Sequence, residues 1–361
     1  MDENARERIR NIKSRVVSML EERHRLENGS TGVVSPSKYW LDFCSFFDYM
    51  LWLPEESFSK LRLHTYHLTA DNYQIYYFGV NERSFRDFWM ELIEGIPSEY
   101  VLYEPEGGIG YSFDNGRVVS HDILRFQHIV NTFYRYGIVS SMADGGRKLV
   151  LEIGAGYGGL AHHLSNVLGN VTYIVVDLPE TLLFSASYLS LNNPDKRIYV
   201  YGDRNLSEFL WSPDLSSYDF VLIPNYRLDE LRPLRFDLAI NIASLQEMSL
   251  DQVSTYLGFI AENCRGVFYS WNQDSHPKNA ELGNLSEIIR SMFEITEVSV
   301  GKLPTSLELP STKRKNDTIR RRLRRLLKSI AISLNLWERP VEAFPYPPFR
   351  EWICRPFRNK G

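Results

Sequence analysis

Residues 149–161 read LVLEIGAGYGGLA, and this stretch decides the fold. An apolar run that ends in a glycine-rich turn and continues as a helical pattern is typical of the first strand and helix of a doubly wound α/β sheet. The turn carries the pattern Glu-x-Gly-x-Gly-x-Gly between Glu152 and Gly158. Glycine is needed there because the backbone takes positive φ angles and a ligand must approach the main chain closely. The stretch therefore predicts a ligand-binding turn at the start of a parallel sheet.

Around this turn, short apolar segments alternate with segments of helical periodicity, which indicates a parallel sheet with right-handed crossovers. We expect an α/β fold with a doubly wound Rossmann-like sheet of seven strands, the last antiparallel, because 292–300 and 349–357 look like a final antiparallel pair. The apolar run 218–228 interrupts the scheme, and we interpret it as an additional edge element or a loop over the site. The five preceding strands are expected at 148–154, 171–178, 197–203, 236–244 and 266–273.

The composition along the chain predicts three regions. Residues 1–116 are expected to form a mainly helical lid or oligomerisation region, because helical spacing and many aromatic residues mark this part. The Rossmann-like domain is expected to comprise 117–310 and 340–361. Between its two parts lies 311–339, which we interpret as a basic amphipathic helical insertion.

The overall composition excludes several classes of partner. The chain has 361 residues, a formal charge of −4 and a pI near 6.1, so it has no global attraction for nucleic acid. Its three cysteines, Cys44, Cys264 and Cys354, are far apart and odd in number, which suits a reducing compartment. No stretch approaches the roughly 20 apolar residues that span a bilayer. We therefore expect a cytoplasmic protein without a nucleic-acid partner.

Two cofactors compete for the glycine-rich turn. Gly154, Gly156 and Gly159 also satisfy the dinucleotide pattern G-x-G-x-x-G, which is weak evidence by itself. Glu152 is not part of that pattern, but its carboxylate can accept hydrogen bonds near the cationic amino-acid end of S-adenosylmethionine. A buried carboxylate needs such a partner, because an unpaired buried ion costs several kcal/mol. The turn therefore favours S-adenosylmethionine, with a nicotinamide dinucleotide as the alternative.

Further cofactor contacts are expected where the next strands end. An acidic group that closes the second strand of a doubly wound sheet binds ribose hydroxyls, and the end of the third strand would meet the adenine edge. Asp203 has an equally good interpretation as a helix N-cap. The carboxyl end of the fourth strand should hold both the sulfonium and the acceptor. The predicted cofactor-binding residues are Glu152, Gly154, Ala155, Gly156, Tyr157, Gly158, Asp177, Leu178, Gly202, Asp203, Asn241 and Ser244.

Four stretches together resemble the sugar O-methyltransferase family of bacterial polysaccharide and glycoside gene clusters. They are LEIGAGYGG (151–159), VDLPETLLFSASYL (176–189), INIASLQEMSLDQVSTYL (240–257) and VFYSWNQ (267–273). The resemblance covers roughly residues 60 to 300. It implies S-adenosyl-L-methionine as methyl donor and, as acceptor, a hydroxyl of a polysaccharide, nucleotide sugar or glycoside. The alternatives are a methyltransferase for a non-sugar natural product, an NAD-dependent oxidoreductase, and a non-catalytic partner protein with this fold.

A sugar hydroxyl is a poor nucleophile, so a general base is expected on the loops at the carboxyl ends of the strands. Glu247 is the first candidate, although it could instead favour the dipole of the next helix. His276 is the second, with a surface-loop histidine as the alternative. Glu247 and Asp274 could offer oxygen ligands to a divalent metal, but no spacing is specific and we predict no metal site. Three further candidates lie where a helix leads into the domain: His121, Asp122 and Arg125.

The basic segment 313–334 places apolar residues on one helical face and arginines around the rest. It allows three interpretations: a solvated helix packed on the body, a helix on an anionic membrane surface, or a binding site for the phosphates of a nucleotide- or lipid-linked sugar. The amino-terminal helix, in turn, could make contacts in a homo-oligomer.

Overall fold

A computed structural model describes residues 1–27, 33–113, 116–276, 278–301 and 347–357. The basic segment 313–334 and the predicted insertion 311–339 lie outside these residues. Within the described part of the chain, none of the helices is long and apolar enough to cross a bilayer.

The alternating apolar segments form one eight-stranded sheet in the order β5-β6-β4-β3-β7-β8-β10-β9. The strands from β5 to β8 are parallel, whereas β10 is antiparallel to both of its neighbours. The fold class expected from the sequence is confirmed, including the final antiparallel pair. The strand bounds are β3 Lys148–Ile153, β4 Val171–Asp177, β5 Ile198–Val200, β6 Phe220–Pro224, β7 Phe236–Ile242, β8 Cys264–Gln273, β9 Phe293–Gly301 and β10 Phe349–Pro356.

The interpretation of 218–228 as an edge element or loop is wrong. This run supplies β6, which pairs with β4 on one side and with β5 on the other, so the sheet has one strand more than expected. All five residues of β6 are buried, as expected for an inner parallel strand covered on both faces. The segment expected as the third strand forms only the three-residue edge strand β5.

Alternate residues of the strands point to two different hydrophobic clusters, because successive side chains face opposite sides of a sheet. Val150 packs in the cluster with α7 to α10, whereas Leu151 packs in the one with α11 to α13. The helices of the first face are α7 His121–Arg135, α8 Ile138–Ala143, α9 Gly159–Leu168 and α10 Pro179–Asn192. Those of the second are α11 Leu206–Trp211, α12 Leu250–Asn263 and α13 Leu285–Met292, with the short helices η3 Pro213–Ser217, η4 Asn225–Leu231 and η5 Leu245–Glu247 nearby in the chain.

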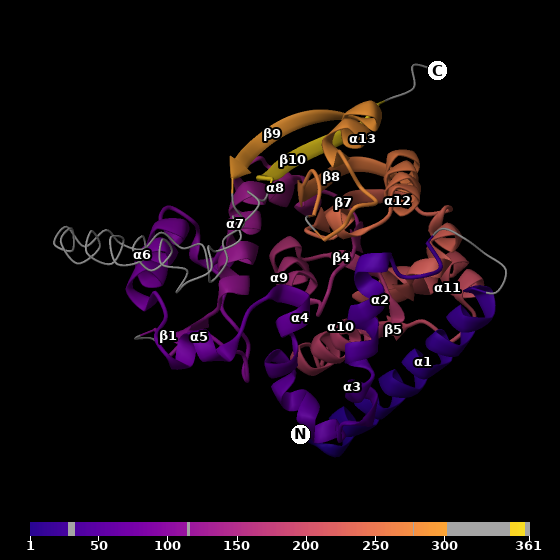
Figure 1. Ribbon diagram of the computed structural model, residues 1–361, viewed down its shortest axis with the longest axis horizontal. Coiled ribbons are helices and arrows are strands. Elements are labelled where there is room, and N and C mark those ends of the chain that lie inside the picture. Colours follow the sequence, from indigo (N-terminus) through magenta and orange to yellow (C-terminus); the bar gives the residue numbers. More distant parts are fainter. Residues whose placement is uncertain (28–32, 114–115, 277, 302–346, 358–361) are drawn as a thin grey trace, which may run out of the picture.

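The amino-terminal part is mainly helical and packs against the sheet domain. Helix α1 buries Ile9 and Val16, and its Arg23 makes a two-pronged ion pair with Glu180 on α10, with N–O distances of 2.8 and 2.6 Å. Figure 1 shows α1 beside β5 at one end of the sheet, and β9 and β10 at the other. The remaining elements are α2 Lys38–Phe47, α3 Tyr49–Trp52, η1 Glu55–His64, α4 Tyr66–Thr69, α5 Tyr73–Tyr77, α6 Glu82–Ile93, η2 Ser98–Tyr100, β1 Tyr111–Ser112 and β2 Val118–Val119.

We expect that Gly154→Ala destabilises the protein. Gly154 has φ +76°, and an added Cβ would lie 2.3 Å from Oγ of Ser244. Overpacking together with a left-handed backbone should lower the free energy of unfolding by roughly 2 to 4 kcal/mol, measured by chemical denaturation. Gly258→Ala in α12 is the matched control, because no atom lies within 4 Å of its added Cβ. Equal stability of the two variants would contradict this account.

Candidate functional site

A cavity of about 930 Å³ lies at the carboxyl ends of β3, β4, β6 and β7. This edge is where open α/β sheets place their ligands. Its floor includes Gly154, Gly156 and Asp177, and one wall is the loop 242–248. Residues of α2 and α4 line it from the amino-terminal region, and Leu68 of α4 lies 4.0 Å from where a Cβ on Gly156 would be. The predicted lid therefore lies directly over the glycine-rich turn.

Asp177 is fixed at the floor of this cavity by two backbone donors. Its Oδ2 accepts from the N–H of Gly156 at 3.0 Å, and its Oδ1 accepts from the N–H of Leu178 at 2.8 Å. Burial raises the pKa of Asp177 to about 6, against the lowering effect of its hydrogen bonds. The glycine turn and the end of β4 are thus held together by one carboxylate that also faces the cavity, as does Leu178.

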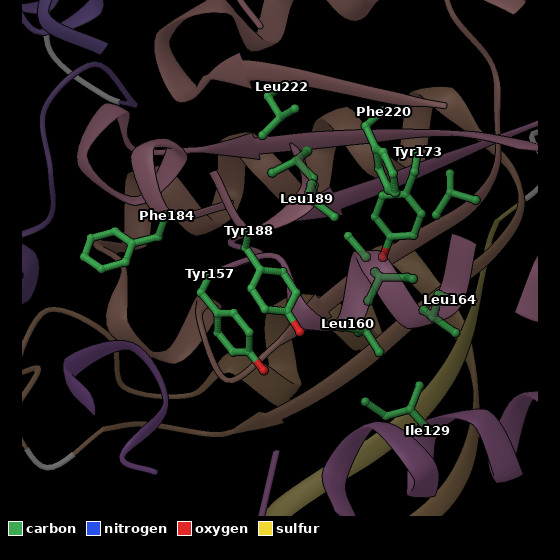
Figure 2. Close-up of a cluster of buried hydrophobic side chains, with 14 of the residues drawn as sticks. Ile129, Tyr157, Leu160, Leu164, Tyr173, Phe184, Tyr188, Leu189, Phe220 and Leu222 are labelled. Atoms are coloured by element: carbon green, nitrogen blue, oxygen red, sulfur yellow. The ribbon is translucent and has the colours of Figure 1, made fainter. Parts of the chain in front are cut away.

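The other predicted residues of the turn do not line the cavity. Gly156 and Gly158 both have positive φ, +58° and +82°, which supports the reason given for glycine at these positions. Tyr157 points into the core, where its ring lies 4.9 Å from that of Tyr188 (Figure 2). Ala155 and Gly158 are likewise absent from the lining. The turn therefore presents Gly154 and Gly156 to a ligand and uses Tyr157 as its anchor.

Glu152 lies beneath the turn and does not reach the cavity wall. Its Oε2 accepts a hydrogen bond of 2.8 Å from the hydroxyl of Tyr173, and the side chain is buried. Burial raises the pKa of Glu152 to about 8. We expected Glu152 to contact the cationic end of a cofactor. In the structure, its side chain instead accepts the hydrogen bond from Tyr173 of the neighbouring strand.

The end of β7 combines a structural amide with a cavity-lining turn. The Asn241 amide donates to the carbonyl of Ile153 at 2.8 Å and to Oγ of Ser244 at 2.7 Å, so it ties the end of β7 to that of β3. Asn241 is buried and does not line the cavity, whereas Ala243 and Ser244 do. Ala243 has φ +53°, a backbone strain that is concentrated at functional sites.

Asn225 is a candidate binding residue that the sequence did not reveal. It follows β6, lines the cavity and is only 2% exposed. Its amide nitrogen donates to the carbonyl of Val33, while its Oδ1 has no hydrogen-bond partner among the described residues. Asn225 was missed because 218–228 was not recognised as an inner strand. The sequence signal for such a strand was the unbroken apolar run FVLIP, which Asn225 follows directly. A buried amide oxygen at a cavity wall is suited to accept a hydrogen bond from a ligand.

Gly202 and Asp203 do not line the cavity. They follow the edge strand β5, where Oδ1 of Asp203 lies 3.3 Å from Nε of Arg15 on α1. Because β6 occupies the position beside β4, the end of β6 and not that of β5 reaches the cavity. At the strand end next to Asp177, the residue that lines the cavity is therefore Asn225 and not Gly202 or Asp203.

Glu247 lies in the short helix η5 and lines the cavity. Trp40 of α2 donates from Nε1 to Oε2 of Glu247 at 3.1 Å, and Ser37 donates to its backbone carbonyl at 2.6 Å. Burial raises the pKa of Glu247 to about 8, and the bond from Trp40 opposes this rise. Ser249 is the N-cap of α12, so Glu247 lies before that helix and not in its first turn. The carboxylate is placed and tuned for proton transfer near neutral pH.

His276 lines the same cavity but suits a different role. Its ring lies 4.8 Å from that of Tyr39, edge-on, and its Nδ1 accepts from the N–H of Lys278 at 3.3 Å. Burial, together with the charge of Lys278, lowers the pKa of His276. With Nδ1 occupied as an acceptor, the neutral ring carries its proton on Nε2. In this tautomer His276 presents a hydrogen-bond donor at Nε2.

Arg125 reaches the cavity, and a buried ionic network holds it there. It pairs with Asp122 and donates to the carbonyl of Thr69 at 3.2 Å. Asp122 also accepts from Arg62, at 2.7 Å, and Arg62 contacts Glu104 at 3.1 Å. His121 and Asp122 do not line the cavity, so they support Arg125 and the lid from behind.

The described residues contain no group of three or more His, Cys, Asp or Glu side chains arranged to hold a metal ion. Asp274, the second ligand considered with Glu247, instead pairs with Arg350 at 3.1 Å and accepts from the N–H of Ser286 at 3.1 Å.

No protein-family model and no curated protein matches the chain. Three solved structures are similar to it at low level. The YcgJ protein from Bacillus subtilis has 14% identity, with 61% of this chain and 96% of that one covered and a TM-score of 0.33. Precorrin-6y C5,15-methyltransferase from Geobacter metallireducens has 11% identity, coverage of 61% and 85%, and a TM-score of 0.31. The N-methyltransferase NodS from Bradyrhizobium japonicum, in complex with S-adenosyl-L-homocysteine, has 14% identity, coverage of 47% and 78%, and a TM-score of 0.31. Two of the three are named as methyltransferases. Similarities with TM-scores below 0.5 carry no conclusion about function, so the function of this chain is argued below from the residues of its own cavity.

The buried carboxylates should make stability depend on pH. The raised pKa of Glu152, about 8, means that the folded state keeps a proton that the unfolded state releases near pH 4.3. Stability from this group is therefore complete below about pH 4 and is lost as pH rises towards 8. Glu152→Gln should remove this loss, so the free energy of unfolding falls less between pH 5 and pH 8.5 than in the wild type, by an amount on the order of several kcal/mol.

Denaturant titrations at a series of pH values measure this effect. Glu208→Gln on the surface of α11 is the matched control and should keep the wild-type slope. An unchanged slope in Glu152→Gln would show that this carboxyl group is ionised in the folded protein.

Proposed function

We propose that the protein is an S-adenosylmethionine-dependent O-methyltransferase that acts on a sugar hydroxyl. The observation that carries this proposal is one cavity with Asp177 and the glycine turn at its floor and Glu247, with its raised pKa, in its wall. The resemblance to sugar O-methyltransferases supports the same activity.

The residues around the floor fit the chemical groups of S-adenosylmethionine. Asp177 would accept from the ribose hydroxyls, and the unpartnered Oδ1 of Asn225 would accept from the adenine amino group. Arg125 would pair with the carboxylate of the amino-acid end. Gly154 and Gly156 leave the main chain accessible between these groups.

The upper part of the cavity fits a saccharide. The rings of Tyr39, Trp40 and Phe43 offer apolar faces on which the C–H surface of a sugar packs. Gln246 and Gln273, which are hydrogen-bonded to each other at 3.2 Å, add amide groups suited to hydroxyls. A mainly apolar site with a few placed polar groups is the usual make-up of a specific ligand pocket.

S-adenosylmethionine supplies an electrophilic methyl group on a cationic sulfur. Glu247 would accept the proton of the acceptor hydroxyl as the methyl group passes from sulfur to that oxygen and the sulfur keeps the electron pair of the broken bond. Trp40 occupies Oε2 of Glu247, so Oε1 would take the proton. His276 would donate a hydrogen bond from Nε2 to a neighbouring oxygen of the acceptor. Holding two reactants in line can lower a barrier by about 7 to 11 kcal/mol.

Calorimetry should detect binding of S-adenosylmethionine and no binding of NAD. Asp177→Ala should weaken binding of S-adenosylmethionine at least about 100-fold, because two charge-assisted hydrogen bonds to the ribose would be lost. Asn225→Ala should weaken it roughly 2- to 10-fold, because one hydrogen bond to the adenine amino group would be lost. Asp203→Ala is the matched control, since Asp203 follows β5, two strands away from β4, and lies outside the cavity. If NAD bound tightly and this binding were lost in Asp177→Ala, the methyltransferase proposal would be wrong and an NAD-dependent oxidoreductase would be indicated.

Glu247→Gln should lower kcat by about 10²- to 10⁴-fold, because the variant cannot accept the proton of the acceptor hydroxyl. Turnover is measured with methyl-labelled donor on a panel of saccharides, and the product is identified by the added mass of one methyl group. Full turnover of the variant on an identified acceptor would exclude Glu247 as the base.

Trp40→Phe should shift the pH dependence of that turnover. Its indole lowers the pKa of Glu247, which is about 8, so its loss should move the midpoint of the rising limb to higher pH. Trp211→Phe serves as the control, because Trp211 is 74% exposed on α11. An unshifted midpoint would mean that another group sets the pH profile.

A further inference from the structure

A row of aromatic rings leads from the cavity wall to the surface. Tyr39 and Phe43 line the cavity, and their ring centroids are 5.2 Å apart. Phe43 lies 6.5 Å from Phe46 and 6.0 Å from His67, and the rings of Phe46 and His67 stack at 5.9 Å with an angle of 16°. Tyr66 continues the row, 5.3 Å from His67. We refer to Phe43, Phe46, Tyr66 and His67 as the aromatic row.

The outer part of this row is open to solvent. Phe46 is 57% exposed and Tyr66 is 49% exposed. Phe46 does not line the cavity, whereas the other three residues of the row do. Because large apolar side chains gain free energy when they are removed from water, a contiguous exposed group that joins a ligand cavity marks a further contact surface.

The size of the cavity indicates what lies on this surface. A volume of about 930 Å³ is near the upper end of the range of about 300–1,000 Å³ for ligand sites. A donor and an acceptor would share this volume, and an acceptor longer than the cavity would extend along its rim. The aromatic row forms that rim.

The charge of α2 favours a neutral ligand on the row over an anionic membrane. The charged residues of α2 are Lys38 and Asp42, which cancel. A helix that binds an anionic bilayer needs several basic residues, and α2 lacks them. Exposed rings on a helix without net charge suit the C–H faces of neutral sugar units.

We propose that Phe46 and His67 form a second sugar subsite at the edge of the cavity, so that the acceptor is a neutral oligosaccharide or polysaccharide chain and not a monosaccharide. This inference rests on the proposed function, because it extends the acceptor from the hydroxyl near Glu247. The first sugar unit lies among Tyr39, Trp40 and Phe43, and the next one stacks on Phe46.

An array of neutral and anionic oligosaccharides and their constituent monosaccharides tests the proposal. The full-length protein is applied with methyl-labelled S-adenosylmethionine, and both retained protein and transferred label are measured. We expect neutral oligosaccharides to retain the protein and accept label about tenfold better than the matching monosaccharides. Phe46→Ala should reduce both signals on the oligosaccharides to the monosaccharide level and leave the monosaccharide signal unchanged.

Phe78→Ala is the matched control, because Phe78 is 71% exposed at the end of α5 and makes no contact with the row. It should behave as the wild type on every glycan. Thermal unfolding of Phe46→Ala should match that of Phe78→Ala, since both side chains are largely exposed.

The outcomes separate this proposal from the proposed function. Equal labelling of monosaccharides and oligosaccharides, a neutral effect of Phe46→Ala, or retention by anionic glycans alone would overturn the second subsite while the methyltransferase activity stands. Retention by oligosaccharides that depends on Phe46, without any transfer of label, would support the subsite and overturn the proposed activity. Binding of anionic phospholipid vesicles that is lost in Phe46→Ala would identify the row as a membrane contact and overturn the subsite.

Discussion

The hydrogen bond from the N–H of Gly156 to the carboxylate of Asp177 fixes the turn on which the rest of the site depends. It joins the turn after β3 to the end of β4, while the amide of Asn241 at the end of β7 donates to the carbonyl of Ile153 at the end of β3. Three strand ends are therefore tied together at one point. A change in the turn moves the floor of the cavity and its wall together, because both are built from the same few backbone atoms.

The amino-terminal region completes the site and does not merely cover it. Trp40 and Ser37 both bind Glu247, and Arg125 donates to the carbonyl of Thr69 at the end of α4. Behind these contacts, Arg62 meets three acidic side chains in a buried network, Asp71, Glu104 and Asp122. Removing one partner from such a network leaves an uncompensated buried charge, which costs several kcal/mol. The network therefore fixes the segment around Arg62 and Asp71 relative to α7.

Much of the sheet could be predicted from local sequence, but the site could be predicted only in part. The glycine turn, the strand that ends in Asp177 and the last two strands were predicted correctly as elements, because each has a clear pattern within its own short segment. The inner position of β6 was not, because an unbroken apolar run of five buried residues has no periodicity that distinguishes an inner strand from a covered loop. That error directed attention to Gly202 and Asp203, which do not line the cavity, and left out Asn225, which does. The bond from Trp40 to Glu247 spans 207 positions, so no local pattern could reveal it.

The carboxyl groups of Asp177 and Glu247, when ionised, favour the binding of a cation in the cavity. Burial raises the pKa of both Asp177 and Glu247, and the charge of Asp177 adds to the rise at Glu247. Ionising both groups in the enclosed space is costly, because each loses solvation and each repels the other. A positive charge bound between them favours both ionised forms, and by linkage each ionised form favours the cation. For the proposed activity, a sulfonium donor would thereby lower the pKa of Glu247, so the base would become active when the donor is present and stay largely protonated when it is not.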